Sequence, residues 1–162
     1  MNNPSKPKIA VFPGSFDPIT IGHESIITRA LDIFDKIIIA VGNNESKKSF
    51  FNLDVRLSMI KEVFKNNNKV EVDQFNGLTI DFCKQVNARY ILRGLRTSAD
   101  FEYERAIAQV NKAMYPEIGS VFILTLPEHT SINSSIVREI LRYGGDVSKF
   151  IPQSVNLKNF VI

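Results

Sequence analysis

Short apolar runs alternate along the chain with longer segments in which apolar residues recur at helical spacing. The apolar runs are residues 9–12, 36–41, 70–75, 90–92 and 121–124. Strands that are buried on both faces, as in a parallel sheet, have this pattern. We therefore expect five short strands in the interior of the protein.

The segments between these runs have apolar residues three or four positions apart, which is typical of one helix face. In the first segment, which starts at His23, the apolar positions are Ile26, Ile27, Ala30, Leu31 and Phe34. Asn52 can cap a second helix, and further helices are expected at 79–87, at 99–114 and from Ser134. The alternation predicts an α/β fold with a doubly wound five-stranded parallel sheet, whose ligand crevice lies at the carboxyl ends of the strands.

Length and composition are those of an ordinary globular protein. A chain of 162 residues, 44% apolar and 23% charged, suits a single domain over residues 1–162 with a sizeable core. No apolar stretch approaches the length of a membrane span, and the N-terminus lacks the order of a signal peptide. We therefore expect a cytoplasmic protein with no membrane partner. Residues 1–7, which include two prolines, are expected to be disordered.

Charge and cysteine usage narrow the possible partners and chemistry. The net charge of +3 favours anionic partners, but Lys and Arg are dispersed apart from Lys47 and Lys48. We therefore expect no binding of nucleic acid. The single cysteine, Cys83, lies among apolar positions of a predicted helix, which is typical of a buried structural thiol rather than a nucleophile.

The segment from Pro13 to His23 carries the strongest chemical signal. It reads Pro-Gly-Ser-Phe-Asp-Pro-Ile-Thr-Ile-Gly-His and joins the first apolar run to the first helical pattern. A strand that opens through a glycine turn into a helix aims free backbone N–H groups and the positive end of the helix dipole at one point, where an anion can bind. Thr20 and His23 flank that point, so the segment predicts nucleotide phosphate chemistry. Asp17, which precedes a proline, is expected to stabilise the turn.

This segment resembles the signature of the nucleotidylyltransferase superfamily and, in its longer form, that of the bacterial phosphopantetheine adenylyltransferase family. Arg-Gly-Leu-Arg at 93–96 with Asp-Phe-Glu-Tyr-Glu at 100–104, and Ile-Asn-Ser-Ser-Ile-Val-Arg at 132–138, resemble the next two motifs of that family in the same order. The resemblance implies transfer of AMP from ATP to 4′-phosphopantetheine, which gives dephospho-coenzyme A and pyrophosphate. It further implies Mg²⁺ bound with ATP, a homohexamer and feedback inhibition by coenzyme A.

The resemblance also assigns roles to individual residues. Catalytic roles fall to His23, Lys47 and Arg93. The acceptor is expected to contact Ser15, Lys47, Leu78, Thr79 and Arg93. The residues expected to bind ATP are Ser15, Phe16, His23, Gly94, Leu95, Arg96, Glu104, His129, Thr130, Ser131, Ile132, Asn133, Ser134, Ser135 and Arg138. No metal ligands are expected from the protein itself.

The chemistry of adenylyl transfer suits these residue types. The reaction needs the two substrates held in line and the developing charge stabilised, but it needs no protein nucleophile. At a helix N-terminus, the dipole disfavours the imidazolium form of His23, while a neutral ring N–H can still donate to phosphate. The alternative for His23 is a purely structural hydrogen bond at the helix end. For Asp100, Glu102 and Tyr103 the alternative is an exposed helix surface, and one serine at 134–135 can be explained as a helix cap.

Two other functions remain open. A nicotinate mononucleotide adenylyltransferase would share the first and last motifs but should lack the one that begins at Arg93. A non-catalytic nucleotide sensor would need phosphate ligands but no donor such as His23, which is aimed at the transferred group. Ile21, His129 and Asn133 depart from the residues common in the resembled family. These departures affect the expected contacts of segment 128–135 more than the phosphate ligands.

Overall fold

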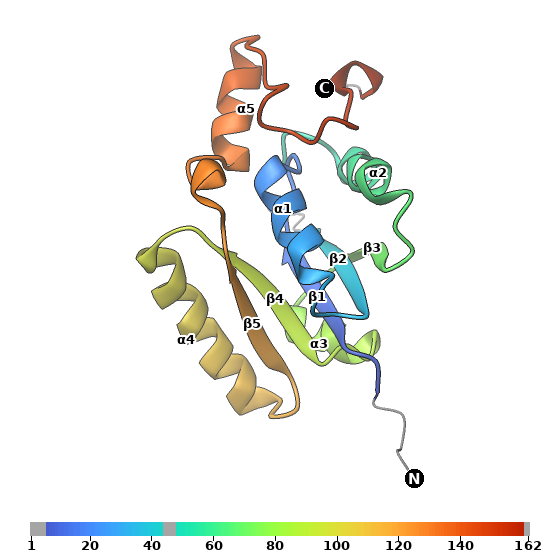
Figure 1. Cartoon of the computed structure of the whole chain (residues 1–162), viewed down its shortest axis with the longest axis vertical. Helices are drawn as coiled ribbons and strands as arrows, with labels where there is room; N and C mark the ends of the chain where they lie inside the picture. Colours follow the sequence, from blue (N-terminus) through green and yellow to red (C-terminus); the bar gives the residue numbers. More distant parts are fainter. Residues whose placement is uncertain (1–5, 44–47, 161–162) are drawn as a thin grey trace.

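The computed structural model describes residues 6–43 and 48–160. Its strands are β1 (Ile9–Gly14), β2 (Lys36–Gly42), β3 (Val70–Phe75), β4 (Tyr90–Leu95) and β5 (Gly119–Leu124), which form one parallel sheet in the order β3-β2-β1-β4-β5 (Figure 1). This order, with the first strand in the middle, is that of a doubly wound α/β fold and confirms the predicted fold class. Most of segment 1–7, for which disorder is expected, lies outside the described residues.

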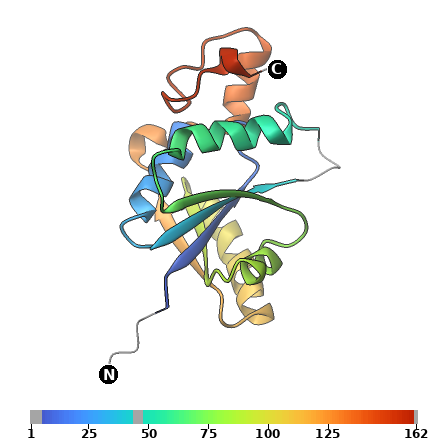
Figure 2. The same ribbon diagram turned by 90° about the vertical axis from the view of Figure 1, so that its right-hand side faces the viewer.

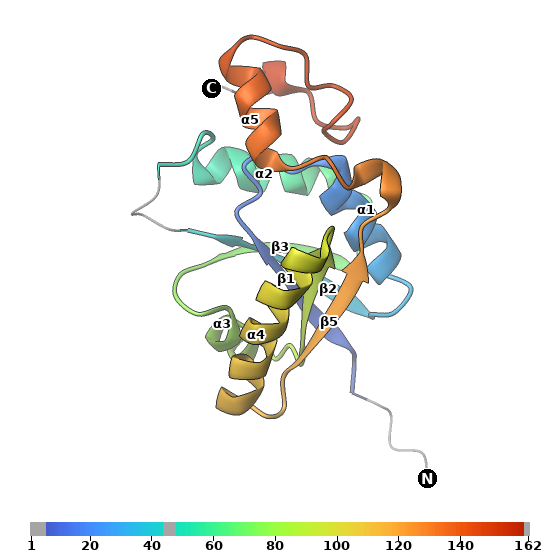
Figure 3. The same cartoon turned by 90° about the vertical axis from the view of Figure 1, so that its left-hand side faces the viewer.

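The helices cover both faces of the sheet, because the right-handed crossovers reverse their direction along the sheet after β3. They are α1 (Ile21–Ala30), α2 (Leu53–Phe64), α3 (Thr79–Gln85), α4 (Ser98–Met114) and α5 (Ser134–Arg142), with short 3-10 helices η1 (Pro127–His129) and η2 (Leu157–Asn159). Helices α1 and α2 lie on one face, and α3 and α4 lie on the other (Figures 2 and 3). None of the helices in the described part of the chain is long and apolar enough to cross a membrane.

Two apolar clusters hold these layers together. The larger one packs α1, α2 and Val137 of α5 against the sheet and takes in Val147, Ile151 and Val155 of the segment after α5. The smaller cluster packs α3, including Cys83, against the other face. The apolar patterns in the sequence therefore correspond to two core layers on either side of one sheet.

Local capping explains where the helices begin. Asn52 caps α2 by accepting the N–H of Val55 at 2.9 Å, as the sequence predicts. The third helix ends two residues earlier than expected, and β4 extends three residues further, through the Arg-Gly-Leu segment. Both differences lie at element ends, where hydrogen bonding and packing rather than composition set the boundary.

The prediction that all strands are buried on both faces is wrong for the two edge strands, β3 and β5, and Leu124 of β5 is largely exposed. In β3 the side chains of Glu71 and Gln74 are exposed, because this strand lies at the edge of the sheet. On α4, four large apolar side chains are partly or largely exposed in the single chain, namely Phe101, Ile107, Val110 and Met114. Helix α4 therefore presents an apolar surface that the core of this chain does not cover.

Strands β1 and β4 separate toward their carboxyl ends. They pair only at Ala10 with Tyr90 and at Val11 with Ile91, whereas β1 and β2 pair along the whole length of β1. This point is where the strand order reverses, and open α/β sheets bind their ligands there. The motifs that begin at Pro13 and Arg93 flank this opening.

Candidate active site

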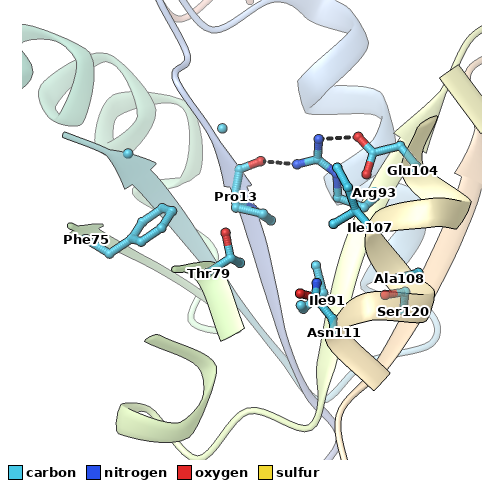
Figure 4. Close-up of a pocket in the computed structure, with 12 residues that line it drawn as sticks. Pro13, Phe75, Thr79, Ile91, Arg93, Glu104, Ile107, Ala108, Asn111 and Ser120 are labelled. Carbon is cyan, nitrogen blue, oxygen red and sulfur yellow. Dashed lines mark hydrogen bonds and ion pairs between the residues drawn. The ribbon is translucent and has the colours of Figure 1, made fainter. Parts of the chain in front are cut away.

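Two cavities lie at the carboxyl ends of the strands. The larger, of about 510 Å³, is bounded by the turn after β1, the start of α1, the end of β4, the start of α4 and residues 132–134. The smaller, of about 270 Å³, lies between the ends of β1, β2 and β4 and helices α3 and α4 (Figure 4). Pro13, Gly14, Arg93 and Glu104 line both cavities, so two ligands bound in them would meet at these residues.

The turn after β1 is tightly built. Phe16 has a left-handed backbone (φ 45°), and its ring lies 5.0 Å from the imidazole of His23. Gly14 allows this arrangement, because a Cβ at that position would lie 3.0 Å from the Phe16 ring. Asp17 is buried, and its two carboxylate oxygens accept the N–H groups of Phe50 and Phe51, each at 2.8 Å. Asp17 is therefore a structural residue of the turn, as the sequence indicated.

His23 is the third residue of α1 and takes part in a reciprocal cap with Thr20. Its Nδ1 accepts the backbone N–H of Thr20 at 3.0 Å, which leaves the ring proton of the neutral imidazole on Nε2. Burial, together with the positive charges of Arg96 and Arg93, lowers the pKa of His23 to about 4. The side chain lines the larger cavity as a neutral group with one N–H to donate.

Arg93 bridges the opening between β1 and β4. Its Nη1 donates to the carbonyl oxygen of Pro13 at 2.8 Å, and its Nη2 forms an ion pair with Glu104 of α4 (Figure 4). Glu104 is the buried residue of α4, so this pair also fixes the helix against the sheet. A guanidinium held by two partners keeps a fixed orientation at the wall shared by the two cavities.

The residues after Arg93 bring a second cation to the larger cavity. Arg96 forms an ion pair with Asp100, with Nε and Oδ2 3.1 Å apart, and its backbone N–H donates to the same oxygen. Burial alone would raise the pKa of Asp100, but the hydrogen bonds and charge of Arg96 lower it overall. Asp100 is thus more than exposed helix surface. At Gly94, a Cβ would lie 3.2 Å from Ile26, so the glycine lets α1 pack closely on β4.

The segment around the start of α5 is tied to the turn after β1. Asn133, rather than a serine, caps α5 by accepting the N–H of Ile136 at 3.0 Å. Ser134 donates from Oγ to the carbonyl of Pro18 at 2.8 Å. Arg138 donates to the carbonyl of Asp17 at 2.7 Å and to Ser135 Oγ at 3.0 Å. Two motifs more than a hundred residues apart in the sequence therefore form one unit.

Most of the predicted nucleotide-binding residues gather around the larger cavity. Its lining includes Ser15, Phe16, His23, Gly94, Arg96, Glu104, Ile132, Asn133 and Ser134. Other predicted positions are not at its wall, namely Leu95, His129, Thr130, Ser131, Ser135 and Arg138. Leu95 is buried in the protein, and the Nδ1 of His129 is buried without a hydrogen-bond partner among the described residues.

The residues predicted to contact the acceptor do not all line the smaller cavity. Thr79 and Arg93 line the smaller cavity, on opposite sides of it (Figure 4). Leu78 is 55% exposed and does not line it. Lys47 lies outside the described residues. Cys83 lines neither cavity, and burial raises the pKa of its thiol to about 12, as expected for a structural cysteine.

Sequence reasoning missed Arg56, a charged residue in the interior next to the site. It is 4% exposed and donates to the carbonyl of Ser15 at 2.7 Å, with a longer contact to the carbonyl of Gly42. The signal was present in the sequence, because Arg56 interrupts the apolar stripe formed by Leu53, Leu57 and Ile60 on α2. Within the described part of the chain, no cluster of three or more His, Cys, Asp or Glu side chains could hold a metal ion.

The chain is similar in sequence to one known protein family and to named enzymes. A model of the cytidylyltransferase-like family matches residues 11–140. The chain is 50% identical over 149 residues to the phosphopantetheine adenylyltransferase of Flavobacterium psychrophilum, a match that covers 92% of this chain and 98% of the relative. It is 47% identical over 148 residues to the enzyme of the same name from Cytophaga hutchinsonii, covering 91% of this chain and 99% of that relative.

Solved structures show the same fold at much lower identity. A bifunctional NMN adenylyltransferase/ADP ribose pyrophosphatase from Francisella tularensis superposes with a TM-score of 0.69 at 18% identity. The match covers 90% of this chain and 45% of that one.

Proposed function

The chain belongs to the cytidylyltransferase-like family and, within it, to the phosphopantetheine adenylyltransferases, and on this premise we propose how its residues transfer AMP from ATP to 4′-phosphopantetheine. The products are dephospho-coenzyme A and pyrophosphate, and the reaction belongs to coenzyme A biosynthesis. The observation that carries the proposal for the site is the pair of cavities that meet at Pro13, Gly14, Arg93 and Glu104. A direct transfer between two substrates needs such a meeting point.

ATP binds in the larger cavity and 4′-phosphopantetheine in the smaller one. The larger cavity has polar walls that suit a nucleotide, with Ser15, His23 and Arg96 among its lining residues. The smaller cavity has a mostly apolar wall that includes Ile91 and Ile107, which suits the arm of the acceptor. Arg93 stands where the acceptor phosphate would approach the nucleotide.

Positioning and charge stabilisation account for catalysis. The acceptor phosphate attacks the α-phosphate of ATP, and pyrophosphate leaves on the opposite side. The Nε2–H of His23 donates to an oxygen of the transferred group as negative charge develops there. Arg93 and Lys47 hold the acceptor phosphate, although Lys47 lies outside the described residues. Ser15 contacts the phosphates of both substrates.

The remaining ATP contacts follow from the resemblance to the family. Ser135 and Arg138 at the start of α5 bind the leaving phosphates, because a helix N-terminus favours anions. The nucleoside lies against Phe16, Gly94 and the part of segment 129–134 that lines the larger cavity, namely Ile132, Asn133 and Ser134. Leu95 and residues 129–131 lie behind this wall, and Glu104 closes the site from α4. Arg138 would turn toward the phosphates from a position where it already contacts the turn after β1.

Mg²⁺ would enter as a partner of ATP. Arg93 and Arg96 of the larger cavity are each paired with a carboxylate, so its wall suits a substrate whose phosphates bring their own cation. Mg²⁺ is commonly held by substrate phosphates and water. Its chemical contribution is to reduce the charge on the triphosphate. Side chains such as Arg96 and His23 orient the nucleotide independently of the ion.

Three further properties are part of the proposal. The exposed apolar residues of α4 support assembly into a homohexamer, which the resemblance implies. Coenzyme A carries both the pantetheine arm and an adenine nucleotide, so it would compete for both cavities as a feedback inhibitor. A cytoplasmic location fits a pathway that consumes ATP. Light scattering of the wild type and of Val110→Glu tests the assembly, because a charge on that surface should dissociate it.

One assay tests the function. Pyrophosphate release from ATP is measured with 4′-phosphopantetheine and, in parallel, with nicotinate mononucleotide as acceptor. Release with the first acceptor alone is expected. Release with nicotinate mononucleotide alone would identify a different adenylyltransferase activity. No pyrophosphate release with either acceptor would favour a nucleotide sensor.

A further inference from the structure

Arg56 is a buried cation that faces backbone carbonyls instead of a carboxylate. It is 4% exposed, its Nη1 donates to Ser15 O at 2.7 Å, and its Nε has no partner among the described residues. Burial lowers its pKa, and the nearby charge of Asp17 opposes that effect in part. The guanidinium therefore lies in the interior with only part of its hydrogen-bonding capacity used.

Such a residue is a poor choice for stability alone. Removing a charge from water has a high cost in free energy, and a well-packed apolar side chain of similar volume often stabilises a protein equally well or better. On α2 the neighbouring buried positions, Met59 and Ile60, are occupied by apolar residues. The contacts of Arg56 rather than its burial must therefore explain its presence.

Those contacts lie at the edge of the active site. Ser15 begins the turn after β1, and Gly42, whose carbonyl lies 3.4 Å from Nη1, ends β2. The same turn is held from the other side by Asp17, whose carboxylate accepts the N–H groups of Phe50 and Phe51 just before α2. Arg56 and Asp17 thus fasten the turn to both ends of the connection between β2 and α2.

We propose that Arg56 is a positioning residue, which fixes the turn at 14–17 relative to the end of β2 so that the two substrates meet in line. The proposal rests on the proposed function, in which Ser15 contacts both phosphates and the two cavities meet at Gly14. Displacement of reacting groups by about 1 Å can cost about 10²-fold in rate. ATP affinity should change little, because Arg96, Arg138 and the start of α5 also bind it.

The experiment compares Arg56→Met with Met59→Ala in the full chain. Met59 is fully buried on the same helix and its side chain donates no hydrogen bond, so its truncation weakens the core without removing a hydrogen bond to the turn. Arg56→Met should fold with a Tm no lower than that of Met59→Ala. Its kcat should fall by about 10²-fold while the KM for ATP stays within about threefold, whereas Met59→Ala should keep its kcat below its Tm.

Arg56→Lys serves as the conservative variant and as the test if Arg56→Met does not fold. The lysine side chain is one bond shorter than that of arginine, so its ammonium stops short of the position from which Nη1 of Arg56 reaches both carbonyls. Its kcat should therefore also fall while ATP binding is retained. A wild-type kcat in Arg56→Met or Arg56→Lys would overturn the proposal. A kcat loss in Met59→Ala as large as in Arg56→Met would do the same, because it would reduce the effect to general destabilisation.

Amide hydrogen exchange gives a readout that does not depend on activity. Exchange at the amides of residues 14–17 and of Phe50 and Phe51 should be faster in Arg56→Met than in Met59→Ala, since only the first loses the hydrogen bonds to Ser15 and Gly42. Equal exchange in the two variants would refute the positioning role. If the wild type releases no pyrophosphate, the proposed function fails, and the exchange data alone then decide the role of Arg56.

Discussion

Replacement of His23 by asparagine separates its structural role from its chemical one. The imidazole uses Nδ1 to accept the Thr20 N–H and keeps its proton on Nε2 at the wall of the larger cavity. An asparagine oxygen can take the place of Nδ1, so the helix cap is retained. Its amide nitrogen is too short to reach the position of Nε2, so the donor to the transferred phosphate is lost.

The expected loss follows from what such a donor contributes. Removing one preorganised donor to a developing oxyanion typically costs about 10²–10³-fold in kcat. We expect His23→Asn to fall in this range with ATP affinity within about threefold of wild type, because the bond strengthens only in the transition state. His23→Gln, whose amide nitrogen can reach the Nε2 position at the expense of the cap, should be less impaired.

Steady-state pyrophosphate release gives kcat, and isothermal titration of ATP gives the affinity. Thermal unfolding of each variant checks that the cap is retained in His23→Asn. The reasoning is refuted if His23→Asn keeps kcat within about tenfold of wild type, or if ATP affinity and kcat/KM fall by the same factor. The second result would make His23 a ground-state ligand.

Other perturbations give distinct outcomes. Arg93→Ala should raise the KM for 4′-phosphopantetheine by about 10-fold or more through loss of a charge-assisted contact, and steady-state kinetics would contradict this if only the KM for ATP rose. Arg138→Ala should weaken ATP in calorimetry while acceptor affinity stays near wild type; equal weakening of both would remove it from the leaving-group side. Cys83→Ser should keep kcat but lower Tm, since a buried hydroxyl needs a hydrogen-bond partner. Loss of kcat in the folded variant would show that the thiol takes part in catalysis. In an NMR titration the ring of His23 should stay neutral from pH 8 down to about 5.5, because its pKa of about 4 lies below the ordinary 6.5.

The same lowered pKa of His23 makes the stability of the folded protein depend on pH in a defined direction. The unfolded chain binds a proton at His23 near pH 6.5, whereas the folded chain does so only near pH 4. The stabilising contribution of neutral His23 is therefore complete above about pH 6.5 and is lost as the pH falls toward 4. A titration shift of His23 near pH 6.5 in the folded protein would contradict both statements.

The sequence predicted the fold because its apolar runs and helical patterns are local and regular. The second helix, capped at Asn52, begins and ends where the pattern indicates. The edge strand β3 differs because exposure depends on the order of strands, which no single run encodes. The sequence also does not show that the apolar side chains of α4 are exposed. A helical pattern of apolar residues predicts burial, but it does not show which part of this chain, or which other chain, packs against them.

Contacts over long sequence separations account for what was missed in the site. The bond from Arg56 to Ser15 spans 41 positions, and those from Asp17 to Phe50 and Phe51 span about as many. A motif reports which residues face the ligand, but it does not report which distant residues hold the motif in place. Those supporting residues become visible only when the folded chain shows which buried polar groups are paired.

The shared wall of the two cavities has a consequence for ligand design. A single molecule that runs past Pro13 and Arg93 would occupy both cavities, and binding of its second half would be an intramolecular event. Its affinity would then exceed that of either half by the effective concentration that the linker imposes. β1 and β4 stop pairing beyond Val11 and Ile91, so the linker would lie beside the point where the two strands separate.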